Sequence, residues 1–462
     1  MIVRGVSIES ARDVDNRPCR FGGAYGLVDM MNRKKFLAMI IAAAIAIFGA
    51  AYRLNQPVTL TIGIFAGNNW DVPQGEPYAI IDEVIKNFEA DNPNVRVKYV
   101  SGIKKEDYSE WLAEQFISGD EPDVFFLPAD DFNLYASTGA LMNLDDFIAG
   151  DKNFSTDVYY PAAFNFGRQD NISYALPCES TLTFMFVNKS LLAKEGIALP
   201  KNDWTWQDFL DICRKVTRDI DGDGVPDQFG CYDYSWQHAA ESNGMKFFRD
   251  DGRTSYFADS RMEETIKFLM ELRSVNRGHE VTPKDFDVGC VAFRPFTFAE
   301  YRTYKPYPWR IKKYSSFEWD CIKMPAGFSG GNISVMDTLL VGMSSRTEHK
   351  ALAWALLKKI CFDKTTQRLI LKKSQALPVR RDVILSVEAQ EIFSWEPDET
   401  SAMTAADISD AMDNSVMPFK FKNYRAAMLF ADSEINKILD GTVPLNNALN
   451  KLQKEVNARL QY

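Results

Sequence analysis

The sequence contains little that points to catalysis. Only 3 of its 462 residues are histidine, and it has no HExxH pair, no Walker A loop and no GxGxxG turn after a strand. One enzyme-type pattern occurs, G-x-S-x-G at residues 327–331. A nucleophile elbow needs a strand before its serine and a helix directly after it, whereas this Gly-rich loop leads into an expected strand at Ile333. We therefore expect a protein that is not an enzyme.

Cysteine is also sparse, and acidic residues outnumber basic ones. The 7 cysteines include no CxxC pair, so we expect no dense disulfide framework, while some pairing and free buried thiols both stay open. With 53 basic and 63 acidic residues the formal net charge is -10, which repels polyanions. We expect no nucleic-acid partner, and a neutral ligand fits this charge better.

A long hydrophobic run occurs only near the amino end. The 16 residues 36–51 are apolar and follow the basic stretch 32–35, which is typical of an export signal. Because a bilayer needs about 20 apolar residues, residues 31–56 are interpreted either as a cleaved signal peptide or as a membrane anchor. No cysteine follows the run directly, so a lipid anchor is not expected. The predicted location is outside the cytoplasm, at the cell surface, membrane-anchored or secreted.

Residues 1–30 carry Arg, Gly and Asp without periodicity. The basic and apolar stretch after Met31 forms a complete signal by itself, so we expect the true start at Met31. Residues 1–30 are then an untranslated or disordered extension.

The rest of the chain predicts an α/β protein with two lobes, because 462 residues exceed what one core usually holds. Residues 79–90 have apolar side chains at helical spacing, and residues 95–99 alternate in the manner of a strand. After a second helical pattern, residues 124–127 form a continuous apolar run, typical of a strand buried on both faces of a parallel sheet. This order is that of a βαβ unit.

Several stretches resemble the extracellular solute-binding proteins of bacterial ABC sugar importers, the family that includes maltose-binding protein. They are NFEADNPNVRVKYVSG at 87–102, SGDEPDVFFL at 118–127, STGALMNLDDFI at 137–148 and DWTWQDF at 203–209. The resemblance implies a two-lobed periplasmic-binding-protein fold with three interlobe crossings. It places residues 57–176 and 340–377 in the N-lobe, and residues 178–338 and 380–462 in the C-lobe.

The resemblance also implies a function. The chain would be the extracytoplasmic substrate-binding component of an ABC importer, a monomer that binds a carbohydrate, in particular an oligosaccharide, between its lobes and delivers it to membrane permease subunits. A second interpretation is an exported carbohydrate-active enzyme, which needs two carboxylates flanking a cleft; Glu179 and Asp337 are the pair to test for it. A third interpretation keeps the same fold for a protein that binds a polyamine, amino acid or phosphate ester, or that serves a sensor as an auxiliary.

Candidate ligand contacts lie in loops that follow strands and at the crossings. In open α/β sheets ligands bind beyond the carboxyl ends of the strands, and sugars need aromatic platforms beside hydrogen-bonding groups. Simpler interpretations exist, since Asp130 or Asp131 could cap the next helix, and Glu179 could be a hinge carboxylate held by backbone amides. Where the family has Gly-Pro-Trp this chain has Arg294, Pro295 and Phe296, which leaves the role of Arg294 open. The predicted contacts are Asn69, Trp70, Asp71, Asp130, Glu179, Ser180, Tyr234, Trp236, Phe296 and Asp337.

One segment resembles the start of an EF-hand calcium loop. Asp219, Asp221, Asp223 and Asp227 occupy positions one, three, five and nine, and a glycine stands at position six. Position twelve is Gly230 instead of the bidentate glutamate. A structural calcium ion that staples this loop and a tight Asp/Gly turn without an ion are the two interpretations, and no other cofactor is expected.

Overall fold

The computed structural model describes residues 38–39, 41, 57–73, 78–249, 252–305, 316–393, 403–418, 421 and 423–461. The chain divides into two compact units, Met1–Val58 and Thr59–Tyr462, and the second unit contains the cores and the sites described below. The predicted extension at 1–30 lies outside the described residues, as does the predicted signal at 31–56 apart from three exposed helical residues, Ala38, Met39 and Ile41. Among the described residues, no helix has both the length and the apolarity needed to cross a membrane.

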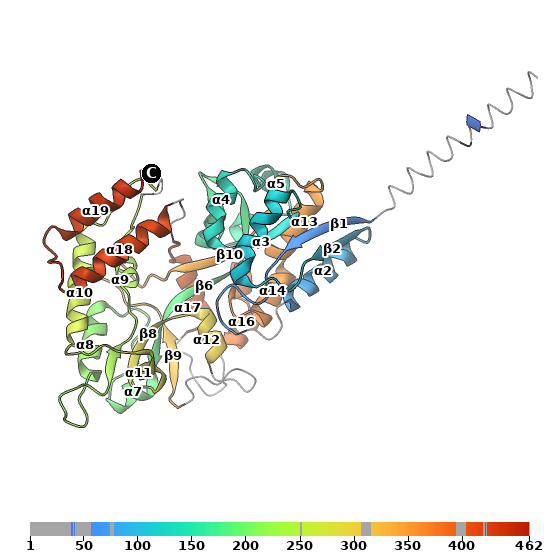
Figure 1. Ribbon diagram of the computed structural model, residues 1–462. Coiled ribbons are helices and arrows are strands. Elements are labelled where there is room, and N and C mark those ends of the chain that lie inside the picture. Colours follow the sequence, from blue (N-terminus) through green and yellow to red (C-terminus); the bar gives the residue numbers. More distant parts are fainter. Residues whose placement is uncertain are drawn as a thin grey trace, which may run out of the picture. The chain divides into compact units, whose positions relative to one another are not determined.

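A mixed nine-stranded sheet runs through the second unit (Figure 1). Its main path has the order β2-β1-β3-β10-β6-β8-β7, and β9 and β11 pair with β6 away from this path. β1 and β3 are parallel, whereas β10 is antiparallel to both β3 and β6. The strands are β1 (Val58–Gly63), β2 (Val95–Tyr99), β3 (Val124–Leu127), β6 (Ala175–Asn188), β7 (Phe229–Cys231), β8 (Val291–Thr297), β9 (Trp319–Ile322), β10 (Met336–Met343) and β11 (Leu377–Pro378), and a separate hairpin joins β4 (Arg168–Gln169) to β5 (Ile172–Ser173).

The long strand β6 joins the two halves of this sheet: the first half contains β2, β1, β3 and β10, and the second half contains β8, β7 and β9. Its first part, up to Leu182, pairs with β10, and its second part, from Thr183 to Asn188, pairs with β8 and β9. At Glu179 three distant segments meet, because this residue lies opposite Leu339 of β10 and Pro378 of β11. The three segments predicted as crossings are therefore side by side at one point of the fold.

The buried apolar side chains form two hydrophobic cores, and β6 contributes to both. The first core contains residues from β1, β3, β8, β9 and β10 and from the helices α2, α3, α13 and α14. The second core contains residues from α8, α10, α18 and α19. These helices are α2 (Ala79–Asp91), α3 (Lys105–Ser118), α8 (Trp206–Val216), α10 (Ser260–Ser274), α13 (Lys350–Cys361), α14 (Lys364–Lys373), α18 (Tyr424–Leu439) and α19 (Ala448–Arg459).

Shorter helices connect these elements. Two of them matter for the site: the 3-10 turn η1 (Ala129–Asp131) after β3, and α9 (Trp236–Ser242) after β7. The others are α4 (Phe132–Ser137), α5 (Asp145–Gly150), η2 (Thr156–Val158), α6 (Pro161–Phe166), α7 (Lys189–Lys194), α11 (Pro283–Asp287), α12 (Phe298–Tyr304), α15 (Arg381–Ile384), α16 (Val387–Phe393) and α17 (Ala405–Asp413).

The carboxyl-terminal part contributes to both cores. Ile384, Ile408 and Met412 belong to the first core, and residues of α18 and α19 belong to the second. The Tyr160 hydroxyl, just before α6, donates a hydrogen bond to Ser409 Oγ of α17 at 2.8 Å. The lobe boundaries themselves stay a prediction.

Candidate functional site

Trp70 and Glu179 form one hydrogen-bonded group at the crossing. Trp70 Nε1 donates to Glu179 Oε1 at 2.8 Å, and Ser374 Oγ donates to Glu179 Oε2 at 2.6 Å. Burial raises the pKa of Glu179, while these two hydrogen bonds and the charge of Arg302 act in the opposite direction. Side-chain donors thus hold the Glu179 carboxylate, where the simpler interpretation expected backbone amides, and its contact with a ligand stays a prediction.

A small cavity adjoins this group. It has a volume of about 70 Å³ and is lined mainly by apolar side chains, with Asn68, Asn69, Glu179, Thr366 and Ser374 as its polar members. Pockets for small molecules typically measure about 300–1,000 Å³, so this cavity is too small for a sugar ring.

Three further predicted contacts have partners within the protein. The hydroxyl of Ser180 is fully buried and lies 2.9 Å from Thr338 Oγ1. Asp337 is partly buried, and its Oδ1 accepts a hydrogen bond from the backbone N–H of Thr338 at 2.7 Å. Asp71 is exposed and pairs with Lys105 Nζ at 2.8 Å; the same ammonium group donates to the carbonyl oxygen of Asn69.

Tyr234 and Trp236 line a second, larger cavity of about 920 Å³ beside β7, α10 and α18. The Tyr234 hydroxyl accepts a hydrogen bond from Trp206 Nε1 at 3.0 Å and lies 3.1 Å from Ser242 Oγ. Trp236 is only 2 % exposed, and its Nε1 donates to Asp432 Oδ1 at 2.8 Å. The ring of Trp236 therefore packs in the second core and presents little surface for stacking.

Phe296 is enclosed as well. Its side chain is 1 % exposed and packs against Phe186 and Trp319, with ring centroids 5.7 and 5.9 Å away. Arg294, whose role was open, places its guanidinium 5.0 Å from the ring centroid of Phe286 and 5.5 Å from that of Phe296. Arg294 thus acts as a cation on an aromatic cluster.

Two residues that the sequence analysis missed are Glu241 of α9 and Tyr424 of α18, and the charges of Glu241 and Asp130 both act on Tyr424. Burial raises the pKa of Glu241 to about 8. The pKa of Tyr424 is raised by burial, then by the charge of Glu241 and then by that of Asp130. Asp131 does not cap α4 with its side chain, which accepts a hydrogen bond from Ser109 Oγ at 2.6 Å. The only sequence signal for Glu241 was the residue itself, a single glutamate that follows two alanines and precedes a serine.

The Gly-rich loop at 327–331 packs on the carboxyl end of α9. A Cβ at Gly330 would lie 2.1 Å from the Ser242 carbonyl oxygen, so only glycine fits this close approach. The hydroxyl of Ser329 donates to Glu264 Oε2 at 3.2 Å, which is not the arrangement of an activated nucleophile. Phe328 is 66 % exposed and meets the Trp206 ring edge-on, and it is an aromatic surface that the sequence analysis also missed.

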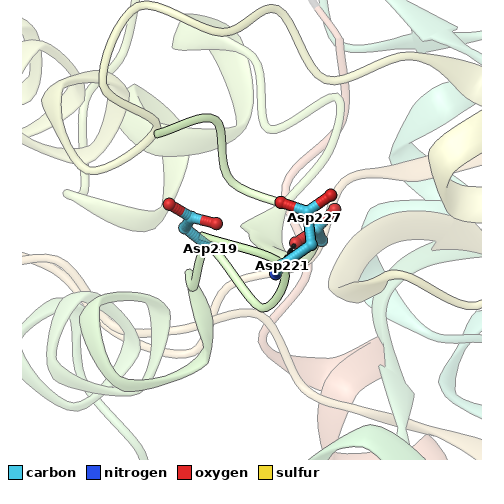
Figure 2. A group of neighbouring side chains, drawn as sticks. All are labelled: Asp219, Asp221 and Asp227. Atoms are coloured by element: carbon cyan, nitrogen blue, oxygen red, sulfur yellow. Dashed lines mark hydrogen bonds between the residues drawn. The ribbon is translucent and has the colours of Figure 1, made fainter. Parts of the chain in front are cut away.

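The predicted calcium loop brings three of its four aspartates together. Carboxylate oxygens of Asp219, Asp221 and Asp227 lie within 4.8 Å of one another (Figure 2). Asp223 is outside this group and accepts from the backbone N–H of Val225 at 2.8 Å. Both oxygens of Asp219 also accept backbone N–H groups, those of Gly222 and Gly224, as in an Asp/Gly turn. Oxygen ligands of this kind suit Ca²⁺, and calcium binding here stays a prediction.

The central strand of the sheet contributes side chains to two cores, and three chain segments lie side by side at one of its residues. This arrangement defines a two-lobed binding protein of the periplasmic type. Residues 73–360 match the model of the family described as bacterial extracellular solute-binding protein. The chain belongs to this family, whose members bind solutes outside the cytoplasm.

Individual relatives agree with this assignment. An uncharacterized lipoprotein of Streptomyces antibioticus is 23% identical over 348 residues, which cover 69% of this chain and 70% of the relative. The cyclic alpha-maltosyl-1,6-maltose binding protein of Arthrobacter globiformis has a similar structure, with a TM-score of 0.73, 18% identity and coverage of 88% of this chain and 99% of the other. The cycloalternan-bound ABC substrate-binding protein of Listeria monocytogenes gives a TM-score of 0.65 at 20% identity over 88% and 100%. At identities of 18% and 20%, the similarity of these two structures shows the fold of this chain.

Proposed function

We propose that the protein is the substrate-binding component of an ABC importer, which binds an oligosaccharide between its two lobes and delivers it to membrane permease subunits. The observation that carries this proposal is the meeting of β6, β10 and β11 at Glu179, because three crossings at one point allow two lobes to move about a hinge. Support for a sugar comes from the relatives, one of which is named for cyclic alpha-maltosyl-1,6-maltose, while another was solved in complex with cycloalternan. In this proposal the protein acts outside the cytoplasm as a monomer, secreted or held at the membrane.

The exposure of the side chains divides the predicted contacts into two groups. Those whose side chains are exposed or only partly buried are proposed to touch the solute, and they are Asn69, Asp71, Asp130, Tyr234 and Asp337. Those that are buried are proposed to shape and stiffen the walls of the site, and they are Trp70, Glu179, Ser180, Trp236 and Phe296. To the first group we add Glu241, Tyr424 and the exposed ring of Phe328.

A thermal-shift panel followed by calorimetry tests the proposal. The panel contains neutral mono- and oligosaccharides, amino acids and phosphate esters. An oligosaccharide at 100 times its Kd should stabilise the protein by about 2.7 kcal/mol, because it binds the folded state only. Asp130→Asn should weaken binding. Asp82→Asn should not, because it removes only the charge of a carboxylate that accepts a hydrogen bond from the Tyr99 hydroxyl of β2. Stabilisation by amino acids or phosphate esters alone would overturn the assignment of a carbohydrate.

A further inference from the structure

We propose that the larger cavity, beside β7, α10 and α18, is a second carbohydrate site, separate from the site between the lobes. This inference goes beyond the proposed function, because it assigns a binding site to one half of the protein alone. The ligand class is a short neutral saccharide, held by side-chain amides and one carboxylate.

The first argument is the position of the cavity. Every residue that lines it belongs to the segments 213–281 and 432–440. None of these residues comes from β1, β3, β6, β10 or β11, so neither the crossings nor the first half of the sheet contributes to the lining. Of the contacts predicted from the sequence, only Tyr234 and Trp236 line this cavity. The cavity is therefore complete within one half, and a ligand can fill it without closure of the lobes.

The second argument is the size of the cavity and the mixed character of its lining. Its volume of about 920 Å³ lies within the range of about 300–1,000 Å³ that is typical of pockets for small molecules. Leu269 and Leu272 of α10 and Leu439 of α18 supply apolar surface. Such surface beside a few polar groups suits a sugar, which has apolar ring faces and polar edges.

The third argument is a carboxylate that neutral donors hold in the lining. Asp432 is partly buried, and its Oδ1 accepts hydrogen bonds from Trp236 Nε1 at 2.8 Å and from Gln237 Nε2 at 3.4 Å. Its Oδ2 accepts one hydrogen bond, from Asn436 Nδ2 at 3.3 Å. Because a carboxylate oxygen can accept two hydrogen bonds, Oδ2 has a position left for a ligand hydroxyl. The ligand hydroxyl would thus meet an acceptor whose orientation the protein has already fixed.

The fourth argument is an amide in the lining that the protein leaves without a partner. Asn276 follows α10 and is partly buried, and among the described residues no hydrogen bond reaches its side-chain amide. An amide carries both acceptors and donors, and a hydroxyl group can satisfy either. A saccharide hydroxyl at Asn276 would therefore supply hydrogen bonds that the protein itself does not provide.

The charges of the lining argue against other classes of ligand. The acidic members are Asp233, Glu280, Asp432 and Asp440, and the only lysine or arginine among the described lining residues is Arg273, whose Nη1 lies 2.8 Å from Asp440 Oδ1. This excess of negative charge repels an anion. Among the described residues, three or more possible metal ligands converge only in the Asp-rich loop between α8 and β7, so the cavity offers no cage for a metal ion. A neutral ligand with many hydroxyl groups fits best.

The experiment follows two indole N–H signals by nuclear magnetic resonance during titration with maltotriose, cellotriose or spermidine. The Trp236 indole N–H, which is bound to Asp432, reports on the cavity, and the Trp70 indole N–H, which is bound to Glu179, reports on the crossing. Trp236→Phe and Trp70→Phe assign the two signals. At least one of the two saccharides should shift the Trp236 signal to saturation, with a Kd of its own.

Three variants locate the response. Asn276→Ala should raise the Kd measured at Trp236 by about tenfold, because a saccharide hydroxyl loses its amide partner, and should leave the Kd measured at Trp70 unchanged. Asn450→Ala is the matched control, since it removes an exposed amide from α19 in the same half, and it should change neither Kd. Asp130→Asn, which changes the proposed site between the lobes, should leave the Kd measured at Trp236 unchanged.

The outcomes separate this inference from the proposed function. A Trp236 signal that neither saccharide moves would overturn the second site and leave the site between the lobes in place. The same holds if both signals follow one Kd that Asp130→Asn raises equally. A Trp236 signal that only spermidine moves would overturn the saccharide in favour of an amine. A saturable response at Trp236 with none at Trp70 would support the second site and count against the proposed function.

Discussion

Glu241 should make the stability of the protein depend on pH in an unusual direction. Its pKa is about 8 in the folded protein and about 4.5 when unfolded, so between these values the folded state binds more protons than the unfolded state. The free energy of unfolding then falls as pH rises through this window, by up to about 1.4 kcal/mol per pH unit. Glu241→Gln lacks this contribution and should exceed the unmodified protein in stability above pH 8. Urea unfolding of both proteins from pH 5 to 9 measures the difference, and parallel curves would contradict the prediction.

Trp236 should behave as a core residue when it is changed. Trp236→Ala removes a ring that packs against Phe247 and Phe257, and it should lower the free energy of unfolding by about 3–5 kcal/mol. Trp236→Phe keeps most of the apolar volume but leaves Asp432 without its indole donor, at a cost of about 1–3 kcal/mol. Chemical unfolding of the two variants checks this order. A stable Trp236→Ala protein that had lost only solute binding would restore the stacking interpretation.

At the scale of elements, local patterns were sufficient for much of the fold. The predicted helix at 79–90 is α2 (Ala79–Asp91), the predicted strands at 95–99 and 124–127 are β2 and β3, and every residue of β3 is buried. Thr205 and Asp208, which are three residues apart, form the capping box of α8. These features depend on neighbours in sequence, so periodicity and capping chemistry reveal them.

The functional site was harder to predict because its partners are distant in sequence. Trp236 is 196 residues from Asp432, and Glu179 is 195 residues from Ser374. An aromatic residue in a loop after a strand looks the same whether it faces a ligand or the core, and only the fold decides which. Glu241 escaped notice for the same reason, since Tyr424, on which its charge acts, lies on a helix near the carboxyl end.

The Asp-rich loop between α8 and β7 is predicted to bind calcium weakly. With three clustered carboxylates and no glutamate at position twelve, we expect Ca²⁺ to bind weakly, with a Kd of about 10⁻⁴–10⁻³ M. Calcium at ten times its Kd should then add about 1.4 kcal/mol to the free energy of unfolding. Asp219→Asn should abolish this effect, and Asp223→Asn, outside the cluster, should largely retain it. A melting temperature that 10 mM Ca²⁺ leaves unchanged would support an Asp/Gly turn without an ion.

For the whole molecule we predict closure on binding. A solute held by residues of both halves gains its full set of contacts only when the halves approach, so binding should shift the population towards a compact form. Small-angle scattering should show a smaller radius of gyration at saturation with the solute than without it. Asp130→Asn, tested at a solute concentration that saturates it, should close to the same extent, because it changes affinity and leaves the hinge intact. A scattering profile that saturation leaves unaltered would contradict closure.

The long strand β6 has a consequence for the order in which the protein is made. Ser180 contacts Thr338, 158 residues further along, and the ladder of β6 also requires β11 at Leu377–Pro378. As the chain leaves the ribosome from its amino end, the centre of the sheet has no partners until most of the sequence has been synthesised. Pairing over such distances is slow. The chain should therefore remain unfolded through most of its synthesis, and an unfolded chain is the form that can thread through a narrow channel in a membrane.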